Sequence, residues 1–300
     1  MMKQGRLLTI RVAACALVLS VGAEVWAAHD HPQREWTAEE TKVLKQQFTP
    51  LPIPDHAVGG RSRTIYVIGE PGKPPVLLLH ELPGLTLECL DFARRLSGEG
   101  FRVYVPLLFG NFGERLSNPR MGLVFVRHDV HPLSKDEVSP MIQVARDALE
   151  RIDVDQPGRR VGVIGMCLSG NFGIPLLADN RVASAVLAQP ALPLAINSAH
   201  KHALGVSAKD VSAAVQSGKR MLAVHFTEDS KSPKERYVTL RAAFPPEQLS
   251  IIDIDSAAGN EAKIPQNAHA VLTEWYSPMK THPTHKAFDA VVQLLQETVR

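Results

Sequence analysis

The stretch Val161-Gly-Val-Ile-Gly165-Met-Cys167-Leu-Ser169-Gly170 contains a short apolar run, a turn and the start of a predicted helix, in that order. This order is typical of a nucleophile elbow, the G-x-S-x-G turn between a strand and a helix, here with cysteine in place of serine. The turn strains the backbone of the nucleophile and needs small residues two positions to either side, where Gly165 and Ser169 stand. We therefore predict that Cys167 is a nucleophile, with the N–H groups of the following helix favouring its thiolate form. A buried structural cysteine is the alternative.

Apolar runs on both sides of this turn alternate with amphipathic or capped stretches. The apolar runs are typical of strands buried on both faces of a sheet, and they cover residues 64–68, 76–79, 103–106, 161–164, 182–188, 221–226 and 249–254. The predicted helices cover residues 37–47, 86–99, 139–152, 170–179, 208–216, 233–244 and 286–299. This alternation predicts an α/β fold, a mostly parallel sheet with helices on both faces, over residues 61–300. Residues 110–136 form the one long irregular segment, which we expect to be a lid or binding loop.

Two partners for the cysteine follow later predicted strands, in the chain order nucleophile, acid, histidine. Asp229 comes just after a strand, at the edge of the sheet where catalytic groups converge. Glu228 is its rival. His269 follows the next strand and is expected to act as general base and acid, held in one tautomer by the carboxylate. His282 and His285 are fallback candidates at the start of the last helix.

The loop after the second apolar run reads His80-Glu81-Leu82-Pro83-Gly84-Leu85. In the chain order of α/β-hydrolases, this is the position of the loop whose backbone N–H completes an oxyanion hole. Lipases usually carry glycine after this histidine, whereas here the position is Glu81. Beside a cysteine, a carboxylate could accept the thiol proton when substrate binds. A solvated loop glutamate is the alternative.

Several motifs together resemble the dienelactone hydrolase family. They are the stretches 79–85 (LHELPGL), 96–106 (LSGEGFRVYVP), 165–170 (GMCLSG) and 267–273 (NAHAVLT) together with Asp229, so the resemblance covers residues 60–298. It implies an α/β-hydrolase fold and a reaction that needs no metal or organic cofactor. It also implies roles for single residues: Cys167 as nucleophile, Asp229 and His269 as its partners, Glu81 as the thiol-activating carboxylate, and the N–H groups of Leu82 and Leu168 as the oxyanion hole.

Two departures from the family pattern concern the substrate and the turn. The best-known members carry an arginine that binds the substrate carboxylate four residues after the catalytic histidine, where this chain has Thr273. Arg127, in the irregular segment, is a candidate for a second substrate-binding arginine. The turn carries Ser169 where the family more often has glycine. The fold and the triad are therefore expected to hold, while the dienelactone substrate is not.

The first residues are typical of a secretory signal peptide. Lys3, Arg6 and Arg11 precede the apolar run 12–21, and Ala27 is the expected cleavage point, so residues 1–27 would be removed. An uncleaved membrane anchor is the alternative. Residues 28–60, rich in His, Pro and Gln, are expected to be an N-terminal extension packed loosely on the domain. The protein is therefore expected to be exported, periplasmic or secreted, with no stable membrane association after cleavage.

Composition limits the partners. Lys and Arg number 33 and Asp and Glu 31, so a net charge of +2 gives no reason to expect nucleic acid as a partner. The mature chain would keep two cysteines, Cys89 and Cys167, which is too few for a disulfide scaffold and forms no C-x-x-C pair. We expect a hydrolase of a small-molecule ester or lactone that forms an acyl-cysteine intermediate. The alternatives are an acyl transferase or thioesterase on the same turn, and a non-catalytic binding domain.

Overall fold

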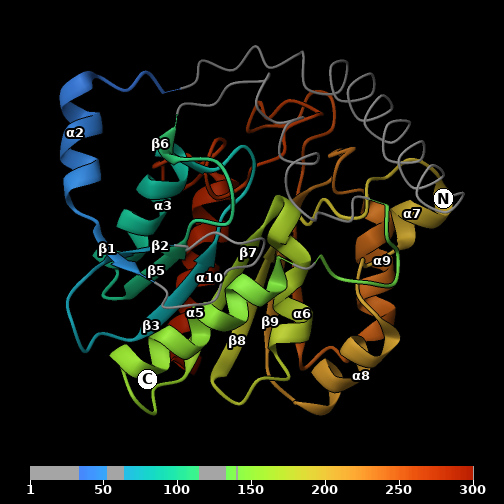
Figure 1. Ribbon diagram of the computed structural model, residues 1–300. Coiled ribbons are helices and arrows are strands. Elements are labelled where there is room, and N and C mark those ends of the chain that lie inside the picture. The colour runs from blue at the N-terminus through green and yellow to red at the C-terminus, as the bar shows by residue number, and fades with distance from the viewer. Residues whose placement is uncertain (1–33, 53–63, 115–132, 140, 300) are drawn as a thin grey trace, which may run out of the picture.

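The computed structural model describes residues 34–52, 64–114, 133–139 and 141–299 (Figure 1). Its centre is an eight-stranded sheet in which β5, β3, β7, β8, β9 and β10 are parallel. At one edge, β2 is antiparallel to β5, and β1 is antiparallel to β2. In spatial order the strands are β1 (Thr49–Pro52), β2 (Thr64–Ile68), β5 (Arg102–Pro106), β3 (Pro75–Leu79), β7 (Val161–Met166), β8 (Val182–Ala188), β9 (Met221–Phe226) and β10 (Leu249–Ile254). The predicted fold class is confirmed.

Helices cover both faces of the sheet. One face carries α2 (Ala38–Gln46), α3 (Leu87–Gly98) and α10 (Pro283–Thr298), and the other carries α5 (Ile142–Asp155), α6 (Gly173–Leu176), α8 (Ala208–Gln216) and α9 (Lys234–Ala243). In Figure 1, α5 lies in front of the sheet and α10 behind it. The short helix α7 (Ser198–His202) contributes no buried residue.

Side chains of each central strand point alternately to these two faces, as the period of a strand requires. In β3, Leu77 and Leu79 belong to the core on the α5 side, whereas Val76 and Leu78 belong to the core on the α10 side. All four are fully buried, and burial of each stabilises the fold by about 1.5–3 kcal/mol. This explains why the strands read as continuous apolar runs without alternation.

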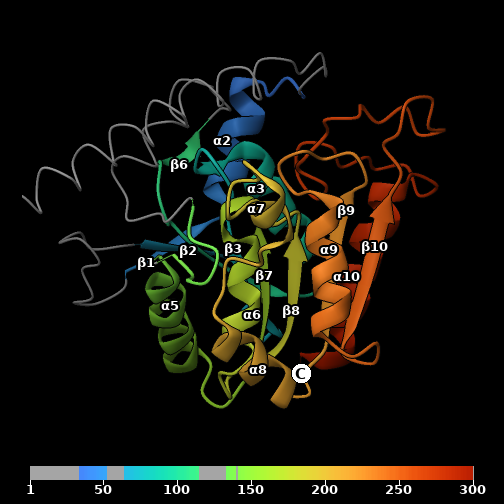
Figure 2. The ribbon, with the colours of Figure 1, turned by 90° about the vertical axis from the view of Figure 1, so that its right-hand side faces the viewer.

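The carboxyl ends of the parallel strands meet at one end of the sheet. In Figure 2 the arrowheads of β8 and β10 point to this end, where the chain that follows β10 also lies. The loops that follow β3, β7, β9 and β10 therefore converge there, and these loops carry the predicted site residues.

The segment predicted as irregular, residues 110–136, begins with a strand. β6 (Phe112–Glu114) pairs in parallel with β4 (Leu85–Thr86), which follows the predicted oxyanion loop. Gly110 makes this possible, because it has φ 72° and a Cβ on it would lie 2.5 Å from the Pro83 carbonyl oxygen. Only glycine allows the backbone at position 110 to come this close to Pro83. Residues 115–132, and with them Arg127, lie outside the described residues.

The N-terminal region contributes to the domain more than a loosely packed extension would. β1 pairs with β2 as an edge strand, and Leu44 of α2 is buried in the core on the α10 side. Trp36 Nε1 also donates to Glu88 Oε1 of α3 at 3.0 Å. The predicted boundary at residue 60 and the signal peptide at residues 1–27 both lie outside the described residues. In the ranges that the structure describes, no helix is both long and apolar enough to span a membrane.

Candidate active site

Cys167 stands at the turn that follows β7, with a backbone φ of 52°. A non-glycine residue with positive φ is uncommon and strained, and this conformation is what a nucleophile elbow imposes. The surroundings require glycine, since a Cβ on Gly165 would lie 2.2 Å from the Ser169 carbonyl oxygen and one on Gly170 2.5 Å from Pro190 Cα. The turn predicted from the sequence is therefore present, with its small residues in the predicted places.

Ser169, which replaces the more usual glycine, holds this turn together. Its hydroxyl oxygen accepts from the Met166 N–H at 3.1 Å and lies 2.9 Å from the Leu79 carbonyl oxygen, to which it donates. It thus connects the turn after β7 to the end of β3, where the oxyanion loop begins. The side chain is 1% exposed.

Ser169→Ala is expected to lower the free energy of unfolding by about 1–3 kcal/mol, because it leaves the Met166 N–H and the Leu79 carbonyl without this buried partner. Urea unfolding measures the loss. Ser230→Ala, at an exposed serine, is the control and should change stability by less than about 0.5 kcal/mol. Equal effects of the two substitutions would contradict this role.

The helix behind the turn begins earlier, and with a tighter winding, than predicted. The chain forms a 3₁₀ helix, η2 (Cys167–Phe172), and then one turn of α-helix, α6, which ends at Leu176. The prediction of a helix over residues 170–179 is correct for α6 but wrong in its bounds and in the type of its first turn.

Asp229 and His269 lie together beside Cys167. His269 Nδ1 is 2.6 Å from Asp229 Oδ2, and their side chains are 5% and 0% exposed. Burial lowers the pKa of His269, but the charges of Asp229 and Cys167 and hydrogen bonds to both side chains outweigh this and raise it above its ordinary value. A charged imidazole next to the sulfur is the arrangement that a thiolate nucleophile needs.

Glu81 lines the same pocket, where it is 6% exposed. Its Oε1 accepts from the Thr273 hydroxyl, and its Oε2 lies 3.3 Å from Gln189 Nε2. Burial raises the pKa of Glu81 to about 7, although the Thr273 hydroxyl, the charge of His269 and the Gln189 amide act in the opposite direction. The alternative of a solvated loop glutamate is therefore wrong.

Glu81→Gln is expected to change how stability depends on pH. In the wild type the pKa of Glu81 rises from 4.5 to about 7 on folding, so in this range the unfolded state binds fewer protons than the folded state and stability falls as the pH rises. The glutamine of the variant has no titratable group, so position 81 contributes no pH dependence. Its free energy of unfolding relative to the wild type should therefore increase by about 2–3 kcal/mol between pH 5 and pH 8. Urea unfolding at both pH values tests this, and a difference independent of pH would contradict it.

The predicted oxyanion loop is held by the side chain of His80. Its Nε2 accepts from the Leu108 N–H at 2.9 Å, which leaves Nδ1 to donate to the Glu81 carbonyl oxygen, also at 2.9 Å. Leu82 follows in the loop and lines the pocket, while Leu168 follows the cysteine at the start of η2. The two residues named for the oxyanion hole thus lie next to Glu81 and Cys167 respectively.

The rival residues lie elsewhere. Glu228 is exposed, and its N–H donates to the Ser256 hydroxyl at 3.0 Å. His282 caps the start of α10, and His285 stacks on Tyr276, so neither lines the pocket with the cysteine. Cys89 is fully buried in α3 and unpaired, in agreement with its interpretation as a core residue.

The sequence did not reveal Lys231 or Gln189 as residues of the site, and it predicted no contact for Thr273. Lys231 lines the pocket, its N–H donates to Asp229 Oδ1 at 2.9 Å, and burial lowers the pKa of its ammonium group. Gln189 contacts Glu81 from the end of β8, and Thr273 does so from the loop of His269. Lys231 was detectable as a cation two positions after the proposed acid, whereas Gln189 carries no sequence signal.

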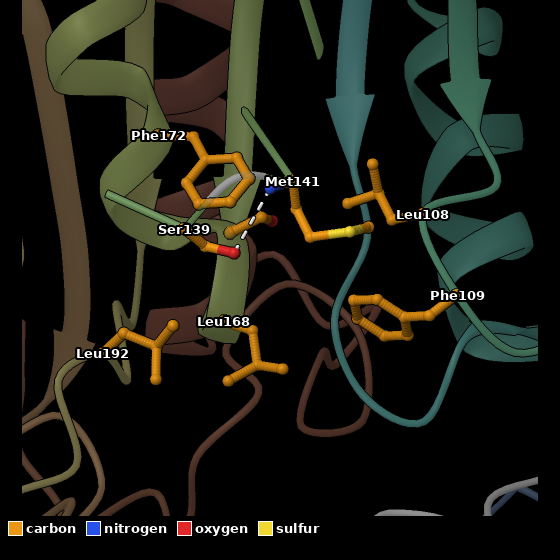
Figure 3. Close-up of a pocket in the computed structure, with 8 residues that line it drawn as sticks. Leu108, Phe109, Ser139, Met141, Leu168, Phe172 and Leu192 are labelled. Atoms are coloured by element: carbon orange, nitrogen blue, oxygen red, sulfur yellow. Dashed lines mark hydrogen bonds between the residues drawn. The ribbon is translucent and has the colours of Figure 1, made fainter. Parts of the chain in front are cut away.

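A second pocket lies against Leu168 (Figure 3). Its lining is almost entirely apolar, and the Ser139 hydroxyl accepts from the Met141 N–H at 3.3 Å. The lining residues are Leu108, Phe109, Ser139, Met141, Leu168, Ser169, Phe172 and Leu192. Within the described ranges, no group of three or more His, Cys, Asp or Glu side chains is arranged to hold a metal ion.

A mostly parallel sheet with a strained turn at Cys167 after β7, an acid after β9 and a histidine after β10 is the arrangement of an α/β-hydrolase. A family model described as the dienelactone hydrolase family matches residues 64–297, and the chain belongs to this family. No curated protein sequence matches the chain.

Solved structures share the fold. A putative dienelactone hydrolase from Klebsiella pneumoniae subsp. pneumoniae MGH 78578 is 17% identical with a TM-score of 0.58, and the match covers 83% of this chain and 98% of that one. The dienelactone hydrolase-like promiscuous phosphotriesterase P91 from metagenomic libraries is 18% identical, with a TM-score of 0.56 and coverage of 85% and 100%. The Pyrococcus furiosus esterase Pf2001 is 13% identical, with a TM-score of 0.55 and coverage of 88% and 96%. Family and fold together support a hydrolase.

Proposed function

We propose that this protein hydrolyses a carboxylic ester or lactone through an acyl-cysteine intermediate. The observation that carries the proposal is the strained Cys167 in one pocket with His269, which Asp229 holds, and with Glu81. A binding domain without catalysis has no need to bring these four side chains together at the carboxyl end of a sheet.

The reaction begins with attack of the Cys167 sulfur on the ester carbonyl carbon, its proton passing to Glu81, because the neighbouring His269 already carries a proton. The oxyanion that forms is stabilised by the N–H groups of Leu82 and Leu168, each worth about 3 kcal/mol. Collapse breaks the bond to the leaving oxygen, which takes a proton from His269, and gives a thioester. A water molecule that donates its proton to His269 then attacks the thioester and releases the acid, and the proton held by Glu81 returns to the sulfur and restores the thiol.

We propose that the substrate differs from that of the best-known members of the family. Thr273 is neutral and donates to Glu81, so this position offers no charge to a substrate carboxylate. The apolar pocket beside Leu168 suits an apolar part of the substrate. We further propose that the enzyme acts in the exported space, in accord with the predicted signal peptide, on small molecules rather than on nucleic acid.

Activated aryl esters should be hydrolysed faster than alkyl esters. The tetrahedral intermediate can expel either the thiolate or the alcohol oxygen. The thiolate leaves easily, so the reaction goes forward only when the alcohol oxygen is also a good leaving group, and this leaving group should limit the rate. We expect kcat/KM for 4-nitrophenyl acetate to exceed that for ethyl acetate by at least about 100-fold. The purified mature chain tests this, and the opposite ranking would count against a cysteine nucleophile. Product analysis with a competing alcohol separates hydrolysis from acyl transfer.

A further inference from the structure

Gln189, which directly follows β8, has an unusual backbone for its residue type. Its φ is 34°, and only two other non-glycine residues in the described ranges, one of them Cys167, have a positive φ. Such a conformation costs about 1–3 kcal/mol and persists when the surroundings impose it. The side chain is fully buried, although both the nitrogen and the oxygen of its amide group are polar. The contacts of this side chain therefore hold Gln189 in its strained and buried position.

The amide of Gln189 joins two loops of the candidate active site. Its Nε2 donates to Glu81 Oε2 at 3.3 Å, and its Oε1 accepts from the Val271 N–H at 3.4 Å. Glu81 lies in the oxyanion loop after β3, and Val271 lies two residues after His269. Gln189 therefore spans from the carboxyl group that is proposed to receive the thiol proton to the loop that carries the imidazole.

Both oxygens of Glu81 are engaged by neutral groups in this structure. Oε1 accepts from Thr273 and Oε2 from Gln189, and Thr273 belongs to the same loop as Val271. These two bonds fix the plane of the carboxyl group, so a rotation toward the sulfur of Cys167 would break one of them. A donor on Oε2 also stabilises the ionised form of the carboxyl group, which is the form that accepts a proton.

We propose that Gln189 is a positioning residue of the hydrolase: it orients the Glu81 carboxylate and fixes its distance from the His269 loop. This inference rests on the proposed function, since it assigns Glu81 a part in thiol activation. Gln189 does not contact the reacting atoms. It acts through Glu81, so its removal should change the pH at which the enzyme becomes active as well as the rate.

The test is the pH profile of kcat/KM for 4-nitrophenyl acetate in two variants. Gln189→Glu keeps the shape of the side chain but puts a carboxylate oxygen against Glu81. Gln189→Gly removes the side chain and also the backbone strain, so it is expected to fold even if the first variant does not. Gln248→Glu is the control, because Gln248 is also a buried glutamine, bonded through Nε2 to the Ala214 carbonyl oxygen at 2.7 Å.

In both Gln189 variants we expect kcat/KM at pH 7 to fall by about tenfold or more. The acid limb of the profile should move to higher pH, by about one unit in Gln189→Glu, since Glu81 loses a donor and gains a negative neighbour. The control should keep the wild-type limb. A lower rate with an unmoved limb would show a structural role only and would overturn the inference, as would wild-type profiles in both variants.

The outcome at Cys167 separates this inference from the proposed function. If Cys167→Ala keeps its activity, the proposed function fails and the inference fails with it. If Cys167→Ala is inactive while both Gln189 variants have the wild-type profile, only the inference about Gln189 fails.

Discussion

Cys167→Ala is expected to lower kcat/KM for 4-nitrophenyl acetate by at least about 1,000-fold, with the fold intact. The substitution removes the only atom that can form the covalent intermediate, and loss of a nucleophile from a serine hydrolase costs up to about a million-fold in kcat. The oxyanion hole and the binding pocket can supply only the residual rate. Stability should change little, because the side chain loses one small sulfur atom at a position where the backbone is already strained.

Cys89→Ala is the matched control for this prediction. Cys89 is the other cysteine of the described chain, fully buried in α3 and absent from the lining of the pocket. It should keep activity within about twofold. Iodoacetamide at neutral pH should inactivate the wild type and Cys89→Ala equally, and mass spectrometry should locate an acyl group on residue 167 after mixing with substrate. Full activity of Cys167→Ala would remove the proposed mechanism.

Asp229→Asn is expected to lower kcat by about 10,000-fold, the loss seen when the acid of a Ser-His-Asp triad becomes an amide. The carboxylate accepts a hydrogen bond from His269 Nδ1 at 2.6 Å and so fixes the tautomer that leaves Nε2 for the hydrogen bond with Cys167. An amide can present its NH₂ group to Nδ1 instead, which places the imidazole proton on the wrong nitrogen. The change also removes a charge that raises the pKa of His269.

The matched control is Glu228→Gln, at the neighbouring carboxylate that the sequence offered as a rival. Glu228 is exposed, and its contact with Ser256 is made by the backbone N–H, which the substitution keeps. This variant should keep kcat within about twofold. Both variants should fold, since the amide oxygen introduced by Asp229→Asn can still accept from the Lys231 N–H. Equal activity of Asp229→Asn and the wild type would show that His269 is oriented by some other group.

Much of the fold was predictable because its signals are local. Strands β8, β9 and β10 have the predicted bounds, since each is a mainly apolar run of six or seven residues. The start of the helix after Cys167 was predicted wrongly, and the structure gives no local sequence signal for its 3₁₀ form. The strand β6 was missed because its partner β4 lies on the other side of α3 and β5 in the chain.

What the sequence determined by itself is the order of the chemistry along the chain. A turn with small residues around Cys167, an acid after one strand and a histidine after the next are each encoded within a few residues, so spacing and residue type suffice to find them. Only the tertiary structure decided the state of Glu81. Its partners Gln189 and Thr273 lie 108 and 192 residues away in the chain. Burial raises the pKa of this carboxyl group more than these two donors lower it, and burial is a property of the packed molecule rather than of any segment.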